Sequence, residues 1–70
     1  MTDTTKLNRI IEQSGLKKRF IAETMGLSPY GLSLKINNIN EFKTGEIERL
    51  CDILRIEDVN DRDAIFFASK

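Results

Sequence analysis

Apolar residues recur along this chain at spacings of three and four, which places them on one side of a helix. The first such stripe consists of Leu7, Ile10 and Ile11. It predicts an amphipathic helix over about Thr5–Ser14, which Gly15 is expected to end. The residues expected to cap its start are Asp3, Thr4 or Thr5.

Two short helices joined by a glycine turn follow, over about Lys18–Met25 and Pro29–Ile36. Gly26 can take the positive φ that a sharp turn requires. Ser28 offers a hydroxyl cap to the second of these helices, and the first position of a helix suits a proline. The expected inner face of the pair is Phe20, Ile21, Ala22, Met25, Leu27, Leu32 and Ile36. The expected outward residues of the second helix are Tyr30, Ser33, Leu34 and Asn37.

A fourth helix is predicted over about Gly45–Leu54, with Thr44 as its cap. Glu46 is an acidic residue in its first turn, where it favours the helix. The apolar stripe of this helix is Ile47, Leu50, Cys51 and Leu54. Phe42, which precedes the helix, is expected to fold back onto the core.

The end of the chain is open to two readings. Asn60 or Asp61 can cap a last helix over about Asp61–Phe67, but the four apolar residues from Ala64 onward cannot all face inward on one helix. The alternative is an extended segment. The pattern as a whole predicts an all-α fold, a single domain over residues 1–70 built as a compact bundle of about five short helices.

The composition excludes several kinds of site. The 70 residues include one cysteine and no histidine, so we expect neither an internal disulfide nor a metal site. Cys51 falls in an apolar stripe and is expected to be a buried small residue. Because no catalytic cluster and no glycine-rich phosphate loop occurs, we expect no enzyme and no cofactor.

No apolar run approaches the roughly 18 residues of a membrane span. The first residues lack the pattern of a signal peptide. We therefore expect a cytoplasmic location and no membrane partner.

Charge is unevenly distributed along a chain that has no net charge. Residues 16–43 carry an excess of three positive charges, and residues 44–63 carry an excess of four negative charges. Such a division suits a protein that meets a polyanion on one side only.

The positive half contains the candidate contacts to DNA. Three consecutive cations at residues 17–19 begin a helix, where cations oppose the helix dipole unless an anion binds there; the alternative is a solvated helix face. The candidate phosphate contacts are Lys17, Lys18, Arg19, Lys35, Asn38, Asn40 and Lys43. On the outward face of Pro29–Ile36, the hydroxyls of Tyr30 and Ser33 can meet base edges, Leu34 can meet a thymine methyl, and Asn37 can donate to a base or a phosphate.

The stretch IAETMGLSPYGLSLKINNINEFKTGEIERLCDIL resembles the phage Cro/repressor (XRE-type) helix-turn-helix family, and the resemblance covers about Leu7–Ile56. The matching motif positions are Ala22, Gly26, Leu27, Ser28 and Leu32. The resemblance implies a bundle of five helices that binds operator DNA, usually as a dimer. It implies that Lys18 takes the place of the family's phosphate-contacting residue on the second helix. The base-facing or groove-facing positions that it implies are Ser28, Pro29, Tyr30, Ser33, Leu34 and Asn37.

Three positions depart from the pattern of this family. Asn38 stands where many members have glycine, which predicts a left-handed backbone at a non-glycine residue. Lys17 stands where a threonine or serine cap is common. Pro29 has no backbone N–H at a position often used for a polar contact.

These features predict a sequence-specific double-stranded DNA-binding transcriptional regulator, of the small Cro-like repressor type found in a phage or prophage. We expect a homodimer on DNA with Ile65, Phe66 and Phe67 as candidate contacts; the alternative is that the two phenylalanines close the core against the first helix. A second hypothesis is a protein-interaction module on the same fold, an antitoxin or antirepressor that uses the acidic half and the Ile65–Phe67 end.

Overall fold

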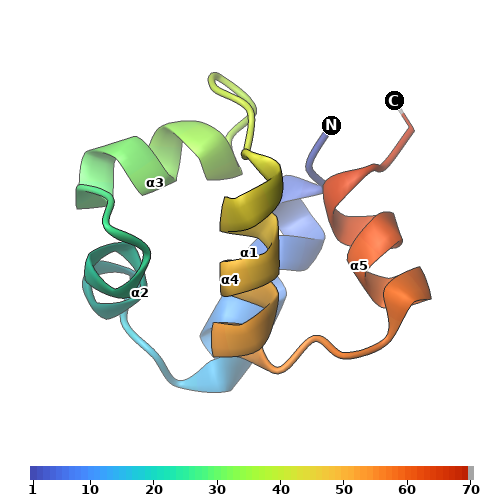
Figure 1. The fold of residues 1–70 in the computed structure, drawn as a ribbon, viewed down its shortest axis with the longest axis horizontal. Coiled ribbons are helices and arrows are strands. Elements are labelled where there is room, and N and C mark those ends of the chain that lie inside the picture. The colour runs from blue at the N-terminus through green and yellow to red at the C-terminus, as the bar shows by residue number, and fades with distance from the viewer. Residues whose placement is uncertain (70) are drawn as a thin grey trace.

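Five helices follow one another along residues 1–69, the part of the chain that the structure, a computed structural model, describes. They are α1 (Thr4–Ser14), α2 (Lys18–Met25), α3 (Pro29–Ile36), α4 (Thr44–Leu54) and α5 (Val59–Phe66) (Figure 1). No strand occurs within those residues. The predicted all-α fold of about five short helices is therefore confirmed.

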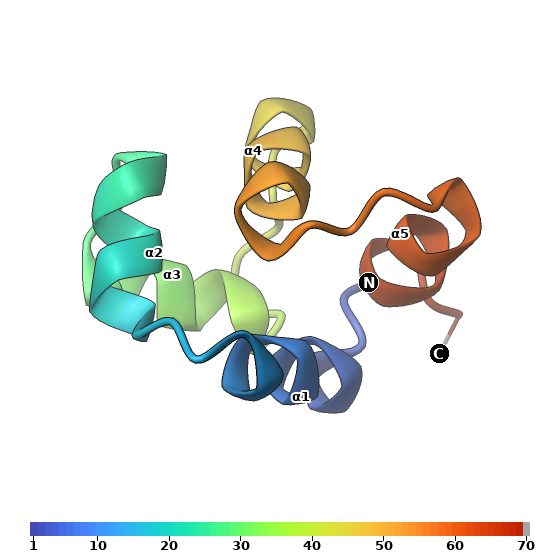
Figure 2. The same ribbon diagram turned by 90° about the horizontal axis from the view of Figure 1, so that it is seen from below.

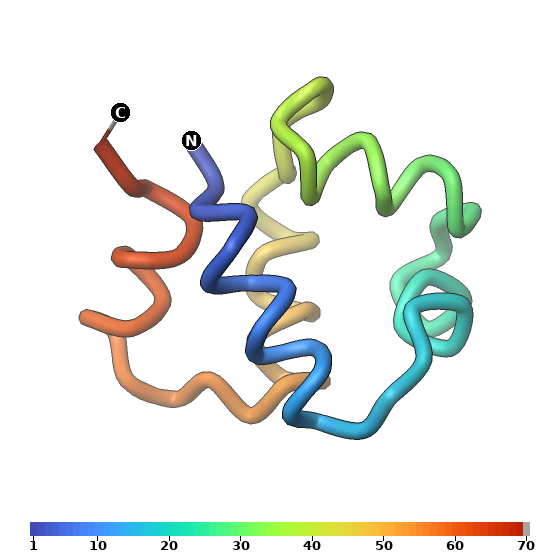
Figure 3. The backbone as a smooth tube through the Cα atoms, turned by 180° about the vertical axis from the view of Figure 1, so that it is seen from behind, coloured from blue at the N-terminus to red at the C-terminus, as the bar shows by residue number. Residues whose placement is uncertain are grey.

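The helices are arranged so that α2 and α3 form one end of the molecule and α5 forms the other (Figure 1). Between these ends lie α4 and α1, and α1 packs against α3, α4 and α5 (Figures 2 and 3). The longest extent of the molecule, 27 Å, runs between the two ends. The α2–α3 pair therefore packs on one side against α4 and α1, and its other side faces outward.

Local capping residues set the bounds of the first three helices. The Asp3 carboxylate accepts a hydrogen bond from the Lys6 N–H at 3.0 Å, and α1 ends at Gly15, whose φ is +76°. The Ser28 hydroxyl accepts one from the Gly31 N–H at 2.9 Å and so caps α3. The predicted bounds of α2 and α3 are confirmed, because glycine, serine and proline each act on the nearest turn.

The starts of the last two helices differ from the prediction. Thr44 is the first residue of α4 rather than its cap, since the Glu46 carboxylate reaches back to the Lys43 N–H at 2.8 Å and extends the helix by one residue. Likewise, α5 begins at Val59 rather than near Asp61. The Asp58 carboxylate accepts from the two N–H groups of residues 60 and 61, at 2.7 and 3.3 Å, so the helix starts as soon as that carboxylate is available.

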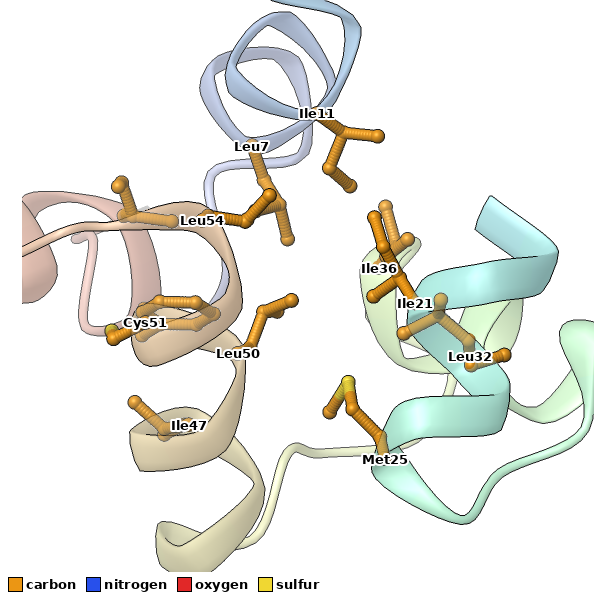
Figure 4. Close-up of a cluster of buried hydrophobic side chains, with 13 residues drawn as sticks. Leu7, Ile11, Ile21, Met25, Leu32, Ile36, Ile47, Leu50, Cys51 and Leu54 are labelled. Carbon is orange, nitrogen blue, oxygen red and sulfur yellow. The ribbon is translucent and has the colours of Figure 1, made fainter. Parts of the chain in front are cut away.

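All five helices contribute to one hydrophobic core (Figure 4). Leu50 of α4 is fully buried and points toward the middle of the cluster, which Leu7 of α1 and Ile21 of α2 approach from the other sides. The buried set is Leu7, Ile11, Ile21, Ala22, Met25, Leu32, Ile36, Ile47, Leu50, Cys51, Leu54, Ile65 and Phe66. Phe42 packs edge to face on Phe66, with ring centres 5.5 Å apart. The predicted apolar stripe of α4 and the predicted return of Phe42 to the core are confirmed.

Phe20 does not belong to this core, contrary to the prediction. Its side chain is 51% exposed. Ile21, Ala22 and Met25 fill the inner face of α2, and Phe20, which is about 100° around the helix from Ile21 and about 200° from Ala22, lies outside that face. Leu27 is only partly buried at the edge of the core.

The last segment is helical through Phe66. Ile65 and Phe66 are buried, while Phe67 is 60% exposed. Of the two phenylalanines, only Phe66 closes the core. None of the helices in the described part of the chain combines the length and the apolar character that crossing a membrane requires.

Candidate nucleic-acid interface

A three-residue turn joins α2 to α3 and sets the two helices steeply across each other (Figure 1). Gly26 ends α2 with a φ of +74°, and the Leu27 N–H donates back to the Ala22 carbonyl at 2.8 Å. Ala22 is fully buried. Its small side chain allows α3 to approach α2 closely, and this packing leaves the far side of α3 facing outward.

The outward side of α3 carries the residues expected there, with different degrees of exposure. Tyr30 is 73% exposed, and Pro29 and Asn37 are exposed as well. Ser33 and Leu34 are half-buried. The Asn37 amide donates to the Ser33 carbonyl at 2.9 Å. The structure therefore brings together a contiguous strip of predicted base-reading residues along the outward side of α3.

Ser28 has a structural task at the start of this strip. Its hydroxyl oxygen accepts the hydrogen bond that caps α3. A side-chain carbon on Gly31 would stand 3.1 Å from that oxygen. The glycine within α3, which costs about 1 kcal/mol against alanine, thus leaves room for the cap.

The basic residues at the start of α2 are all exposed. Lys17 occupies the cap position without a side-chain hydrogen bond to the helix, and the first turn holds no acidic residue. Lys18 and Arg19 follow on the surface of α2. A helix start with N–H groups not capped by a side chain and three cations beside it is complementary to an anion.

Lys35 is placed differently from the three cations at the start of α2. Its ammonium group lies 2.7 Å from a Glu46 carboxylate oxygen and donates to the Glu41 carbonyl at 3.2 Å. The two side chains are 12% and 17% exposed. The phosphate contact of Lys35 stays a prediction, and in the structure this lysine ties the end of α3 to the start of α4 in an ion pair.

The pair also changes the acidity of Glu46. Burial by itself raises the pKa of this carboxyl. The hydrogen bonds from the Lys35 side chain and the Lys43 N–H, together with the positive charges of both lysines, outweigh burial and hold the pKa of Glu46 below its usual value.

Asn38, Asn40 and Lys43 lie in the connection between α3 and α4. The backbone of Asn38 is left-handed, with a φ of +64°, as its place in the sequence predicts. Its side-chain amide is engaged with Thr2 by two hydrogen bonds of 2.8 Å. The phosphate contact of Asn38 stays a prediction, and in the structure its amide is a tie to Thr2. Asn40 and Lys43 are exposed and retain that prediction.

Sequence reasoning missed the polar partners that hold this connection. Thr2 lies 36 residues from Asn38, and no local pattern signals such a pairing. The link between Lys35 and Glu46 spans 11 residues. One signal for these contacts was present in the sequence. Glu46 lies three positions after Lys43, and an acidic side chain at that position can accept a hydrogen bond from the backbone N–H of the cap residue.

The opposite end of the molecule is acidic. An open hollow between the end of α4 and the start of α5 has Glu48, Asp52, Glu57 and Asp58 among its lining residues. Cys51 lies beneath it, and burial raises the pKa of this thiol, which keeps it protonated and unreactive. Residues 1–69 contain no group of three or more metal-ligating side chains arranged around one point.

Residues 2–69 match the family DUF739, whose description reads "Protein of unknown function". The chain belongs to this family. No curated protein matches it. Because the family description carries no activity, the geometry of α2 and α3 has to support any functional conclusion.

Proposed function

We propose that this protein is a sequence-specific double-stranded DNA-binding transcriptional regulator that places α3 in the major groove. The observation that carries the proposal is the turn at Gly26, which presents the outward side of α3 beside three exposed cations at the start of α2. In this arrangement one helix lies against the phosphate backbone while the next enters the groove.

The residues of this surface have two roles. Tyr30, Ser33, Leu34 and Asn37 face the bases, with Ser28 and Pro29 at the entry to the groove. Lys17, Lys18 and Arg19 contact the phosphates of one strand, and Lys43 with Asn40 contacts phosphates further along. Phosphate contacts supply affinity and register, and base contacts select the sequence.

A Cro-like phage repressor of this kind acts by occupying an operator. Two copies on a palindromic site would place their recognition helices about 34–36 Å apart. Ile65 and Phe66 are buried in the core of the chain itself, so of the three residues first considered for the contact between copies only Phe67 remains available.

A labelled random-sequence duplex provides the direct test. We expect fluorescence anisotropy of this duplex to show saturable binding at low salt and a steep fall of affinity as the salt concentration rises. Selection of a preferred sequence from a random library would follow. If micromolar protein at low salt leaves the anisotropy unchanged, the DNA-binding proposal fails.

One observation favours a second candidate, a protein-interaction module such as an antitoxin or antirepressor. Phe67 and Met1 are 60% and 56% exposed, and both line a small hollow near the end of α5. Charge reversal at Lys17 and Lys18 separates the two candidates, because it abolishes DNA binding and leaves this apolar end intact. Lys35 is unsuitable for the test, since reversal there would place two carboxylates together in a mostly buried pair.

A further inference from the structure

The connection between α3 and α4 is fastened at its first turn by the side chain of Asn38. Its Oδ1 accepts a hydrogen bond from the Thr2 N–H at 2.8 Å, and its Nδ2 donates one to the Thr2 carbonyl, also at 2.8 Å. Both distances are those of good N–H···O hydrogen bonds. One side-chain amide thus pairs with both backbone groups of a residue that lies 36 positions earlier in the chain.

Thr2 is itself held on its far side. Residues 1–3, called the terminal strap below, lie along the end of α5. The Asp3 N–H donates to the Ile65 carbonyl at 2.6 Å, and the Ala68 N–H donates to the Met1 carbonyl at 2.9 Å. Thr2 is only 8% exposed. The terminal strap therefore joins the α3–α4 connection to α5, and Asn38 is the point of attachment.

The type of residue at position 38 supports a positional role. Its φ of +64° is one that glycine adopts at no cost and that asparagine tolerates better than most other residues. Backbone geometry alone would accept glycine here. What asparagine adds is the amide, and in the structure both polar atoms of that amide are engaged with Thr2.

We infer that Asn38 is a positioning residue of the DNA interface: it holds residues 37–43 against the terminal strap, and so sets where Asn40 and Lys43 meet the phosphates. The inference rests on the proposed function. Asn38 does not act by direct contact, because its amide is engaged with Thr2 and its backbone N–H points to the Lys35 carbonyl at 3.3 Å. Its effect on DNA passes through the connection that it fastens.

The first test needs no DNA. Asn38→Gly keeps the left-handed backbone and removes the amide, and Asn40→Ala is a matched change in the same connection. We expect Asn38→Gly to lower the NMR backbone order parameters of residues 37–43, and Asn40→Ala to leave those of its neighbours unchanged. Unchanged order parameters in Asn38→Gly would overturn the inference.

The second test is a double-mutant cycle on DNA affinity. Thr2→Pro removes the N–H that Asn38 accepts, while Thr2→Val keeps both backbone groups and serves as the control. We expect Asn38→Gly alone to weaken binding about fivefold, the net value of about one hydrogen bond. In the Thr2→Pro background the same change should have a smaller effect than in the wild type, because one of the two hydrogen bonds to Thr2 is already absent there.

The outcomes of this cycle are distinct. Additive effects of Asn38→Gly and Thr2→Pro would mean that Asn38 meets DNA itself, and the positional role would be overturned. A wild-type protein that binds no duplex would overturn the proposed function instead, and the order parameters would still show whether Asn38 holds the connection. Circular dichroism of each variant establishes that the fold is retained.

Discussion

Tyr30 extends from the first turn of α3 with 73% of its surface exposed. An aromatic side chain in that position contributes little to the core, since the buried face of α3 is made by Leu32 and Ile36. Its removal therefore tests recognition with little effect on folding. The same holds for the cations at the start of α2, whose side chains are exposed.

We predict that Tyr30→Ala lowers the discrimination between a selected operator and a variant site. A direct contact to a base edge is worth about 1–3 kcal/mol of discrimination. The measurement is the ratio of the two dissociation constants at one salt concentration. Tyr30→Phe separates the hydroxyl from the ring, and equal ratios in the wild type and in Tyr30→Ala would remove Tyr30 from the set of base-reading residues.

Lys18→Ala is expected to weaken binding to all sequences alike. Loss of one phosphate contact should reduce the slope of log affinity against log salt by about one. Lys6→Ala is the matched control, because Lys6 is also exposed but lies on α1, beside a hollow formed with Leu54 and Ile65. If both variants keep the wild-type slope, Lys18 meets no phosphate.

At the scale of the helices, the sequence predicts well where a single residue type determines where a helix begins or ends. The bounds of α2 and α3 follow from Gly26, Ser28 and Pro29, each of which acts on its nearest neighbours. The starts of α4 and α5 were missed because several polar residues compete as caps and the carboxylates of Glu46 and Asp58 prevail.

In the candidate site, too, the features that depend on local pattern were predicted and those that depend on distant residues were not. The exposure of Tyr30 and of Lys17 to Arg19 follows from helical periodicity. The burial of Lys35 and the engagement of Asn38 depend on partners 11 and 36 residues away, and no periodicity reports on those. Phe20 shows a third limit, because an apolar residue type does not by itself identify the inner side of a helix.

Two glycines with equal space around them test the turn between α2 and α3. Nothing lies within 4 Å of a side-chain carbon placed on Gly26 or on Gly45, but only Gly26 has a positive φ. Gly26→Ala is therefore expected to lower the free energy of unfolding by about 1–2 kcal/mol through backbone strain alone. Gly45→Ala should raise it, by up to about 1 kcal/mol.

Urea denaturation of both glycine variants gives these values. Equal effects of the two substitutions would show that the positive φ of Gly26 is not what the turn requires.

The ion pair between α3 and α4 gives the fold a dependence on pH. The pKa of Glu46 lies below its usual value in the folded state, so the stabilisation is fully present above the unfolded pKa of about 4.5. It is lost as pH falls through the lower folded value. We predict that Glu46→Gln lowers the free energy of unfolding at pH 7, by on the order of 1 kcal/mol, and reduces its fall between pH 6 and about pH 3.

Denaturant titrations of the wild type and the variant across that range supply the comparison. Parallel pH profiles for the two proteins would mean that the pair does not contribute to stability.

At the scale of the molecule, the two ends differ in sign. The α2 end carries an excess of two positive charges over residues 17–25, and residues 55–63, which lead into and form most of α5, carry an excess of two negative charges. The two regions lie at opposite ends of the 27 Å axis (Figure 1). Although the net charge is zero, the α2 end attracts a polyanion and the α5 end repels it.

The distance between those ends determines the ionic strengths at which the acidic end repels a duplex bound at α2. At about 0.15 M salt the Debye length is about 8 Å, less than a third of the 27 Å axis, so a duplex touching α2 is screened from the acids of α5. Near 0.01 M the Debye length grows to about 30 Å, and repulsion from the far end reaches the duplex. We expect the plot of log affinity against log salt to bend away from a straight line below that concentration. Neutralising Glu57 and Asp61 to glutamine and asparagine should restore the line there and leave affinity at 0.15 M unchanged.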